Sequence, residues 1–385
     1  MLKLRNLFYF LLFVLVCCKK PFNPPASSTP NSYLVVEGFI NSGNDSTVIM
    51  LSKTVQLTGK TTYNPVLGAT VTVEGEKNGV YTLLDNTGNG HYNSYSSLNL
   101  SSSQKYRVKI LINNRQYASD FVEVKQTPPI DSIGFNILNG NVNVYVNAHD
   151  PTNGTRFYRW DYEETWQFHS KYQSGWMLDT TINALVPRPP EQSVYDCFGS
   201  DLSSHVVLAS TEKLAKDVVY QNSVVQIPLS AEKVETRYSI LLKQYALTQD
   251  AFNFYQNLQK NTEQLGSIFD AQPSQLSGNI HCLTDPSELV VGYITANTAQ
   301  TKRIYISHSQ IPNVPINYPY DCEQDTAKNA VVEGLLIDRP VNYIPLQLLF
   351  KPAASPPVAI GFLYSSKECV DCTLRGTKQA PPWWH

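Results

Sequence analysis

Hydrophobic and polar residues alternate along much of this chain, with the two-residue period of β-strands that bury one face. Within residues 33–126, such runs are separated by turn signals. One of these is Asn78-Gly79, which favours a hairpin because both residues tolerate a positive φ. No helical period intervenes between the runs. The pattern therefore predicts an N-terminal antiparallel β-sandwich.

A second β-rich domain is predicted over residues 130–385. Thr127-Pro128-Pro129 marks the boundary, because proline has no N–H to donate to a strand ladder. One main helix is expected at about residues 248–265, with Thr248 as its N-cap and apolar residues at helical spacing. The tail from Pro312 is rich in proline and asparagine, which predicts irregular structure.

One predicted strand, Arg156–Phe168, carries a row of aromatic side chains that share one parity and project from one face. We consider two hypotheses for this row. Either it belongs to the core, or Trp160 and Trp166 form a stacking platform for a sugar or peptide ligand. Glu163 and Glu164 interrupt the row and are predicted to be solvated charges. The row consists of Tyr158, Trp160, Tyr162, Trp166 and Phe168.

A tryptophan pair, Trp383-Trp384, ends the chain just before His385. Exposed tryptophans are costly, so the pair is expected to dock on a surface of its own chain or of a partner. The candidate ligand or partner surface therefore comprises Trp160, Trp166, Trp383 and Trp384.

The N-terminus has the order of residues found in a secretory signal. Lys3 and Arg5 precede the apolar run Leu7–Val16. This run is shorter than the roughly 20 residues that a membrane-spanning helix needs. It has the length and flanks of the apolar part of a signal peptide.

Two cysteines, Cys17 and Cys18, close this apolar run and indicate a lipoprotein signal. We predict that residues 1–17 are removed and that the Cys18 thiol is acylated, with Cys17 as the alternative. An ordinary signal peptide ending in cysteine is the other interpretation. Residues 18–32 then form a tether, and several acyl chains hold the protein stably on a bilayer.

The five later cysteines predict disulfides, since a secreted protein meets an oxidising environment. Their odd number leaves at least one thiol free or paired outside the chain, and sequence alone cannot assign the connectivity. We expect two bridges that pin the C-terminal tail to the second domain. Redox chemistry at Cys369-x-x-Cys372 is the alternative, although no helix is predicted after Cys369 to lower a thiol pKa. The candidates are Cys197, Cys282, Cys322, Cys369 and Cys372.

The charge and motif content exclude several function classes. After loss of the signal peptide, 28 basic and 32 acidic residues leave a net charge of −4, without the basic clusters that nucleic-acid binding requires. No nucleophile elbow, zinc-protease motif, phosphate-binding loop or dinucleotide fingerprint is present. His281 and Cys282 are adjacent and would point to opposite faces of a strand. We therefore predict no catalytic residue, no metal site, no cofactor and a non-enzymatic role.

Several short motifs together resemble the lipoproteins of domain-of-unknown-function family 4249. They are Lys20-Pro21-Phe22, Leu34–Gly38, Pro65–Val71, Phe269–Pro273, Gly278–Ile280, Lys302-Arg303 and Glu368–Cys372. The segment from Pro65 to Tyr92 alone also resembles a carboxypeptidase-regulatory or transthyretin-like sandwich. This resemblance implies an immunoglobulin-like or transthyretin-like fold for the first domain.

The resemblance also implies a setting, because such lipoproteins occur in Bacteroidota envelopes, often encoded beside TonB-dependent outer-membrane receptors. The expected function is a non-enzymatic accessory or ligand-binding partner of such a receptor, anchored in the outer membrane. The alternatives are a stand-alone carbohydrate- or peptide-binding lipoprotein and an envelope enzyme with an unrecognised site. Lys19-Lys20 follows Cys18 where surface-exported lipoproteins often carry acidic residues, so the membrane face stays open.

Overall fold

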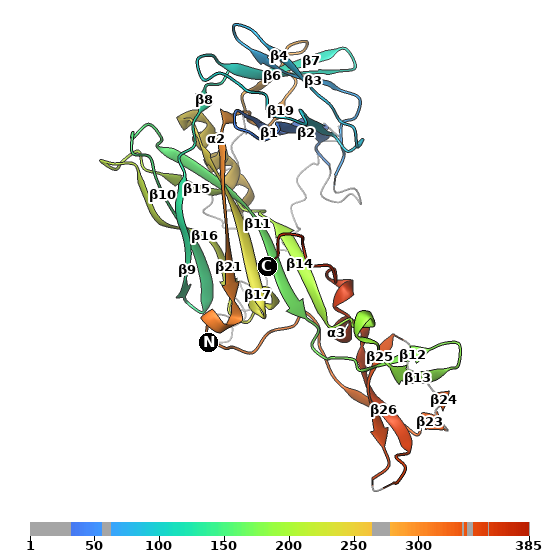
Figure 1. The fold of residues 1–385 in the computed structure, drawn as a ribbon. Helices are drawn as coiled ribbons and strands as arrows, with labels where there is room; N and C mark the ends of the chain where they lie inside the picture. Colours follow the sequence, from blue (N-terminus) through green and yellow to red (C-terminus); the bar gives the residue numbers. More distant parts are fainter. Residues whose placement is uncertain are drawn as a thin grey trace, which may run out of the picture.

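The computed structural model describes residues 32–55, 63–263, 278–332, 335–336, 342–352 and 354–384. Three β-modules follow one another along the molecule (Figure 1), and we call them the first sandwich, the second sandwich and the distal lobe. The predicted mainly β class is confirmed. The predicted acylation site, Cys18, lies outside the described residues. None of the helices in the described ranges is both long enough and apolar enough to cross a membrane.

The first sandwich packs two sheets around one apolar core. One sheet has the order β5-β2-β1-β20-β8 with β19 beside β1, and the other has the order β18-β7-β6-β3-β4. Val36, Val108 and Ile110 alternate into this core, as the two-residue period predicts. The strands that precede the second sandwich are β1 (Leu34–Asn41), β2 (Val48–Lys53), β3 (Thr70–Gly75), β4 (Val80–Leu83), β5 (His91–Asn93), β6 (Tyr106–Ile112), β7 (Arg115–Ser119) and β8 (Val124–Lys125).

Three strands of the first sandwich come from much later in the chain, so the predicted division into residues 33–126 and 130–385 is incomplete. They are β18 (Ile280–Cys282), β19 (Val290–Val291) and β20 (Ala296–Asn297). β19 and β20 pair in parallel with β1, and β18 pairs with β7. Ile280 and Ile294 are buried in the first core. The chain returns because burying these side chains completes a core that residues 33–126 leave open.

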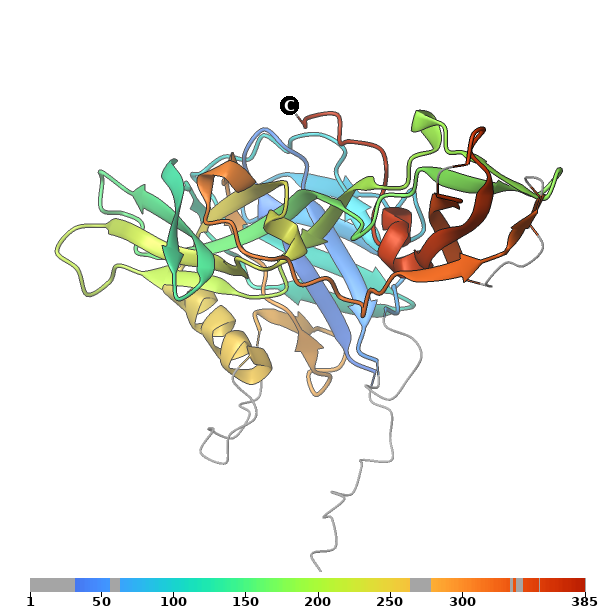
Figure 2. The same ribbon diagram turned by 90° about the horizontal axis from the view of Figure 1, so that it is seen from below.

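The second sandwich packs the sheet β16-β10-β9 against the sheet β14-β11-β17-β21, in which β15 also pairs with β11. Figure 2 shows the two layers from below, with the first sandwich behind them. Its strands are β9 (Ile130–Leu138), β10 (Asn141–His149), β11 (Phe157–His169), β14 (Asp196–Leu202), β15 (Val207–Ser210), β16 (Val218–Pro228), β17 (Arg237–Ala246) and β21 (Ala299–Ser307), with 3₁₀ turns at Pro190–Gln192, Glu232–Val234 and His308–Gln310.

The aromatic row of β11 forms the centre of this second core. Tyr158 and Trp160 are fully buried and stack with ring centroids 5.6 Å apart. The core hypothesis is therefore correct for them. Glu164 was predicted to be solvated, and this is wrong, because it shares the parity of the row and is buried. Lys233 Nζ, 2.6 Å away, and the hydroxyl of Tyr238, 2.8 Å away, compensate its charge.

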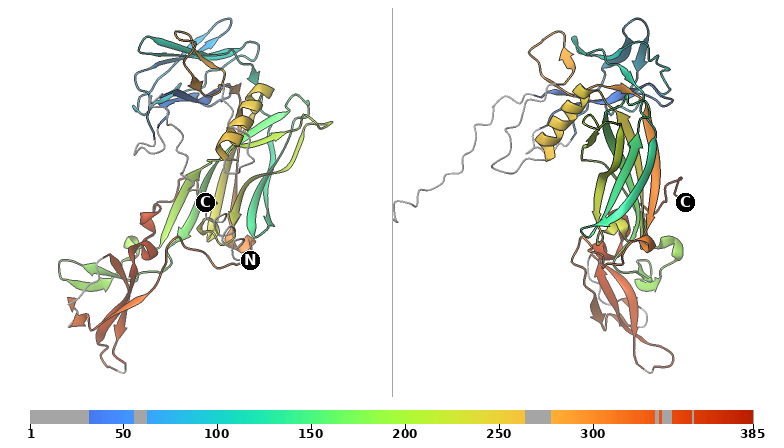
Figure 3. Two further views of the ribbon diagram at one scale, coloured as in Figure 1. Left: turned by 180° about the vertical axis from the view of Figure 1, so that it is seen from behind. Right: turned by 90° about the vertical axis from the view of Figure 1, so that its left-hand side faces the viewer.

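The predicted helix is α2 (Gln249–Glu263), which lies against the upper part of the second sandwich beside the first (Figure 3, left). Ala251 and Phe252 pack on Tyr245 and Phe157. The Thr248 hydroxyl accepts a hydrogen bond from the Ala251 N–H, which confirms Thr248 as the N-cap.

The distal lobe shows that the tail after Pro312 is not irregular, contrary to the prediction. Tyr343–Phe350 and Ala359–Ser366 form a regular antiparallel pair, because apolar residues such as Leu346, Leu348 and Phe362 recur there at strand spacing. The lobe contains the sheets β12-β13-β24-β23 and β22-β26-β25. Its elements are β12 (Trp176–Asp179), β13 (Ala184–Pro187), β22 (Asp325–Lys328), β23 (Val331–Val332), β24 (Leu335–Leu336), β25 (Tyr343–Phe350), β26 (Ala359–Ser366), α3 (Lys367–Val370) and a 3₁₀ turn at Cys372–Leu374.

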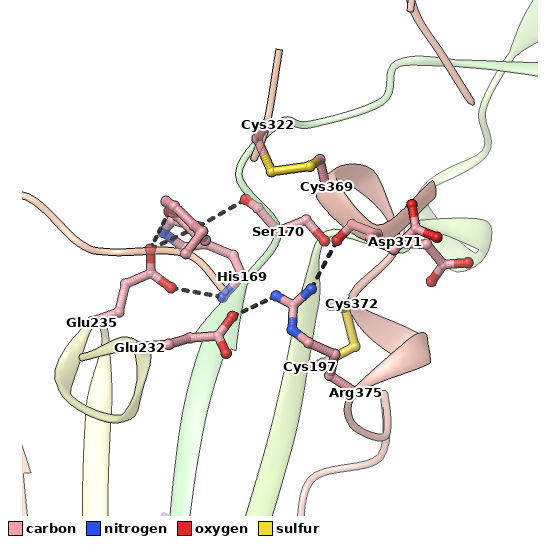
Figure 4. Close-up of polar contacts among 12 residues, drawn as sticks. His169, Ser170, Cys197, Glu232, Glu235, Cys322, Cys369, Asp371, Cys372 and Arg375 are labelled. Carbon is pink, nitrogen blue, oxygen red and sulfur yellow. Dashed lines mark hydrogen bonds and ion pairs between the residues drawn. A yellow bond between two sulfur atoms is a disulfide. The ribbon is translucent and has the colours of Figure 1, made fainter. Parts of the chain in front are cut away.

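Two disulfides hold the junction between the second sandwich and the distal lobe (Figure 4). Cys197 of β14 bonds to Cys372, and Cys322 bonds to Cys369. The predicted number of two bridges is confirmed, but only Cys197–Cys372 pins the tail to the second sandwich, because Cys322 and Cys369 both lie after Pro312. Cys282 is the free, buried thiol. Because Cys369 and Cys372 bond to different partners, they do not form the dithiol pair that the redox alternative requires.

Candidate functional site

A cleft of about 740 Å³ lies between the first and second sandwiches. Its lining comes from β1 and β2 above, from β11 and β17 below, and from α2 at one side. The volume is in the range of small-molecule and peptide pockets, and such sites often lie where two domains meet. This cleft is the strongest candidate site in the described part of the chain.

The apolar wall of the cleft is the outward face of the first sandwich. Val35, Phe39, Val48 and Met50 line it, and all four are partly exposed. Their neighbours along the strands, such as Val36 and Ile49, point the other way into the first core. A sheet face that meets only water normally carries polar residues, so this apolar face needs a covering group.

The floor of the cleft is the outward face of the sheet that contains β11 and β17. Arg159, Asp161 and Glu163 share one parity on β11, opposite to the aromatic row, and they lie beside Tyr245 and Lys243 of β17. Charges of both signs therefore face the apolar wall. Lys243 forms an ion pair with Glu163.

Arg159 of this floor makes two cation–π contacts and one ion pair. Its guanidinium carbon lies 4.9 Å from the ring centroid of Tyr245 and 4.4 Å from that of Tyr255, while Nη2 is 2.6 Å from an Asp161 carboxylate oxygen. Burial opposes the charge, but Tyr255, Asp161 and Tyr245 outweigh it and raise the pKa of Arg159. Among the described residues, its buried Nε has no hydrogen-bond partner.

We expect Arg159→Ala to lower the free energy of unfolding by about 2 kcal/mol, because two cation–π contacts of about 0.5 to 2 kcal/mol each and the Asp161 pair are lost. Arg159→Lys should restore little, since an ammonium group lacks the plane that stacks between two rings. Urea unfolding measures the free energy of unfolding of both variants. Lys243→Ala is the control and should cost less than about 1 kcal/mol, because its ion pair with Glu163 is about one-third exposed. Equal losses in the two variants would contradict this account.

Tyr162 also contributes to the cleft lining, and its ionisation makes the stability of the protein depend on pH at alkaline values. It is 4 % exposed, and burial together with Glu164 raises its pKa from 10.0 to about 12. Below pH 10 the proton is bound in both the folded and the unfolded state. As the pH rises from 10 towards 12, the unfolded chain releases a proton that the folded chain keeps, so stability falls.

Tyr162→Phe should therefore reduce the loss of stability between about pH 9 and about pH 11 by about 1.4 kcal/mol. Urea unfolding at both values measures the difference. Tyr343→Phe, at a tyrosine that is 46 % exposed, is the matched control and should leave the loss unchanged. An identical alkaline loss in the wild type and Tyr162→Phe would contradict the assignment.

The structure does not bring the four predicted tryptophans together. Trp160 is in the core, so the ligand-platform hypothesis is wrong for it. Trp166 is half-buried between Gly199 and Lys233, whose Nζ lies 4.8 Å from the ring centroid. Both residues share the inward-facing parity of β11, so the two rings do not form a platform on its outward face, although Trp166 stays partly exposed.

Trp383 and Trp384 dock on their own chain, on the outward face of β14, β17 and β21. The guanidinium of Arg303 lies 3.5 Å from the ring centroid of Trp383, and the Tyr305 hydroxyl donates to the Trp383 carbonyl at 3.0 Å. Trp384 meets Phe198 edge to face. Trp383 also borders a second, open hollow of about 550 Å³ over β11 and β14.

Figure 4 shows a polar cluster at the disulfide-bonded junction. His169 Nδ1 lies 3.3 Å from the Glu235 carboxylate, and Arg375 pairs with Glu232. The Ser170 hydroxyl is buried and donates to the Val194 carbonyl rather than to His169. The cluster therefore lacks the nucleophile–base contact of a catalytic triad, and its contacts stiffen the junction. No group of three or more His, Cys, Asp or Glu that could hold a metal occurs in the described ranges.

The cleft residues were missed at the sequence level, although one signal was available. Arg159, Asp161 and Glu163 alternate with the aromatic row and so predict a charged outer face for that strand. The signal could not show that Tyr255 and the wall from β1 and β2 lie over this face, because those contacts join distant segments.

Comparison with known proteins gives a family. The model described as "Domain of unknown function (DUF4249)" matches residues 19–303, which include the first sandwich, every residue of the cleft and the second sandwich up to the middle of β21. The match includes the distal-lobe strands β12 and β13 but ends before β22 to β26 and before Cys369-x-x-Cys372. No curated protein matches the chain. Since the matched residues make up well over half of the sequence, the chain belongs to the family defined by the domain of unknown function DUF4249.

Proposed function

We propose that this protein is an outer-membrane lipoprotein that binds, in the cleft between its two sandwiches, a segment of a TonB-dependent receptor. The observation that carries the proposal is the partly exposed apolar wall of Val35, Phe39, Val48 and Met50, which faces a charged floor. Burying such a wall against a partner contributes about 25 cal/mol per Å² of apolar surface. The proposal assigns the protein no catalytic step.

The floor favours a polypeptide as the ligand. Arg159 and Lys243 offer hydrogen-bond donors, whereas Asp161 and Glu163 offer acceptors, within one row of side chains. A peptide segment carries both kinds of group along its backbone, together with apolar side chains for the wall. A purely apolar ligand would remove water from the Arg159–Asp161 and Lys243–Glu163 pairs without offering any hydrogen bond in return.

The proposed anchor is compatible with contact to a membrane barrel. Acyl chains on Cys18 would keep the protein at the bilayer surface. A fully extended tether of residues 18–32 reaches at most about 50 Å. The sandwiches would therefore stay within reach of the loops of a neighbouring receptor, on whichever face of the membrane the lipoprotein resides.

The test is affinity purification of the native lipoprotein from detergent-solubilised outer membranes, followed by mass spectrometry. We expect a TonB-dependent barrel in stoichiometric amount with the wild type. Met50→Asp, which places a charge in the apolar wall, should lose the barrel. Val80→Asp, at a position of β4 that is 68 % exposed and not part of the cleft lining, should retain it.

Thermal unfolding of both variants distinguishes loss of binding from loss of the fold. Recovery of the lipoprotein alone from wild-type membranes would contradict the receptor partnership and favour a stand-alone binding protein. Equal recovery of the barrel with both variants would place the receptor contact outside the cleft.

A further inference from the structure

The outward face of the sheet β16-β10-β9 has an unusual chemical composition. Along β10, Val142, Val144 and Val146 point into the second core, so the residues between them point outward. The cross-strand register places uncharged polar side chains of β9 and β16 beside them. These side chains are Ser132, Asn136, Asn143, Asn147, Ser223 and Gln226.

Hydrogen bonds across the three strands hold these side chains in position. Asn143 Nδ2 donates to Asn136 Oδ1 at 3.1 Å, and Ser223 Oγ donates to Asn143 Oδ1 at 2.5 Å. Asn147 Nδ2 donates to Ser132 Oγ at 2.9 Å in the next row. Asn143 is buried, but Asn136 and Asn147 are exposed or partly exposed and still have donor or acceptor capacity for a ligand, because a carboxamide can make four hydrogen bonds.

Two tyrosines lie within the same face. Tyr145 is paired with Gly134, and a Cβ on that glycine would lie only 2.6 Å from the Tyr145 ring. Because Gly134 has no side chain, the Tyr145 ring can lie flat against β9. Tyr145 remains partly exposed to solvent. Tyr220 of β16 is 75 % exposed, so its ring is accessible to a ligand.

The backbone beside Tyr220 departs from regular strand geometry. Gln221 has φ of 47°, and the pairing with β10 shifts register between Val146 and Ala148. A bulge of this kind changes the direction of a side chain, and a left-handed conformation is uncommon at a residue with a Cβ. The Gln221 N–H donates to Asn147 Oδ1 at 2.7 Å, which joins the bulge to the amide rows.

The chemistry of this face selects one class of partner. In the described part of the chain, the charged side chains beside it gather at one end, where Asp131 pairs with His149 and Lys302 Nζ donates to the Asp131 carbonyl at 2.8 Å. An anionic partner such as nucleic acid needs cations along its whole contact, whereas the described residues place them only at this one end, and a protein partner would normally require an apolar centre. Neutral sugars present hydroxyl groups that both donate and accept, and their C–H faces pack on aromatic rings.

We propose that the outward face of β16-β10-β9 is a binding surface for a neutral glycan, with Tyr145 and Tyr220 as stacking rings and the amide rows as hydrogen-bond partners. The surface is separate from the cleft, so it can be present whether or not the cleft binds a receptor. Figure 3 (right) shows the teal strand β9 of this sheet on the side turned to the viewer.

Affinity electrophoresis of the full chain tests the proposal, in native gels that contain dextran, soluble starch, xylan or galactomannan. At least one of these neutral polymers should retard the wild-type protein. Tyr220→Ala and Asn136→Ala, two changes at exposed positions that leave the core intact, should together weaken the apparent affinity by about tenfold or more. Alginate, a polyanion, should not retard the protein.

Two matched controls localise the effect. Tyr343→Ala removes an exposed ring from the distal lobe, and Met50→Asp alters the cleft, and both should be retarded like the wild type. Competition by short neutral oligosaccharides would indicate a soluble ligand, and retention by the intact polymer alone would indicate a surface polysaccharide. Both results support the proposal. Absence of retardation by all four polymers, or equal retardation of the Tyr220→Ala/Asn136→Ala variant, would overturn it.

Discussion

Replacing Trp160 by alanine should lower the free energy of unfolding by about 3 to 5 kcal/mol, the usual cost of truncating a buried tryptophan. Trp160 is fully buried, and its Nε1 donates to Gln244 Oε1 at 2.8 Å. The Gln244 amide in turn donates to the Pro128 carbonyl at 2.8 Å, in the linker between the sandwiches. The truncation therefore leaves a cavity and a buried acceptor without its donor.

A pair of phenylalanine variants separates the hydrogen bond from the volume. Trp160→Phe should still destabilise, because Gln244 Oε1 loses its donor. Trp166→Phe, six residues along the same strand, should cost less, since the buried Trp166 Nε1 has no partner among the described residues. Urea unfolding provides both values. A larger loss for Trp166→Phe than for Trp160→Phe would contradict the account.

Removing the Cys197–Cys372 disulfide by a double alanine substitution should lower the free energy of unfolding by about 2 to 5 kcal/mol. The two cysteines are 175 residues apart, so the bridge restricts a long stretch of the unfolded chain. Its loss should also loosen the tail that carries Trp383 and Trp384. Limited trypsin digestion should then cleave after Arg375 and Lys378 faster than in the wild type.

Cys282→Ala is the matched control, because this thiol is buried and unbridged. It should cost about 1 kcal/mol, as a small core truncation does, and leave the tail resistant to trypsin. Unchanged stability and unchanged digestion in the double alanine variant would show that the bridge does not hold the tail.

Local features of the sequence are well predicted from periodicity. The spacing of apolar residues predicts the strands β3, β6 and β11 and the helix α2. It also predicts that Trp160 lies in the core. In each case the signal is contained in one short segment whose buried face is decided by its own pattern.

Features that depend on distant segments were not predictable in the same way. β19 and β20 have two residues each, so they show no period, and their pairing with β1 spans most of the chain. Glu164 has a charged side chain at a buried position, and only its contacts with Lys233 and Tyr238 explain it. The five cysteines allowed several pairings, and the folded chain selects two.

The cleft has one part that local periodicity predicts and one part that depends on distant segments. Arg159, Asp161 and Glu163 could be assigned to one strand face, but nothing in that strand indicates an apolar wall opposite them. The wall arises because β1 and β2 use one face for the first core and turn Val48 and Met50 towards the second sandwich. Tertiary packing therefore creates the site, and local sequence supplies only its two halves.

The most direct test of the proposed cleft function is photo-crosslinking in intact cells from a benzophenone amino acid placed at Met50 or, as the control, at Val80. Met50 lies in the apolar wall, and Val80 is an exposed residue outside the cleft lining of the same sandwich. The account predicts a crosslink to a TonB-dependent receptor from Met50 and none from Val80. A receptor crosslink from Val80 and none from Met50 would contradict it.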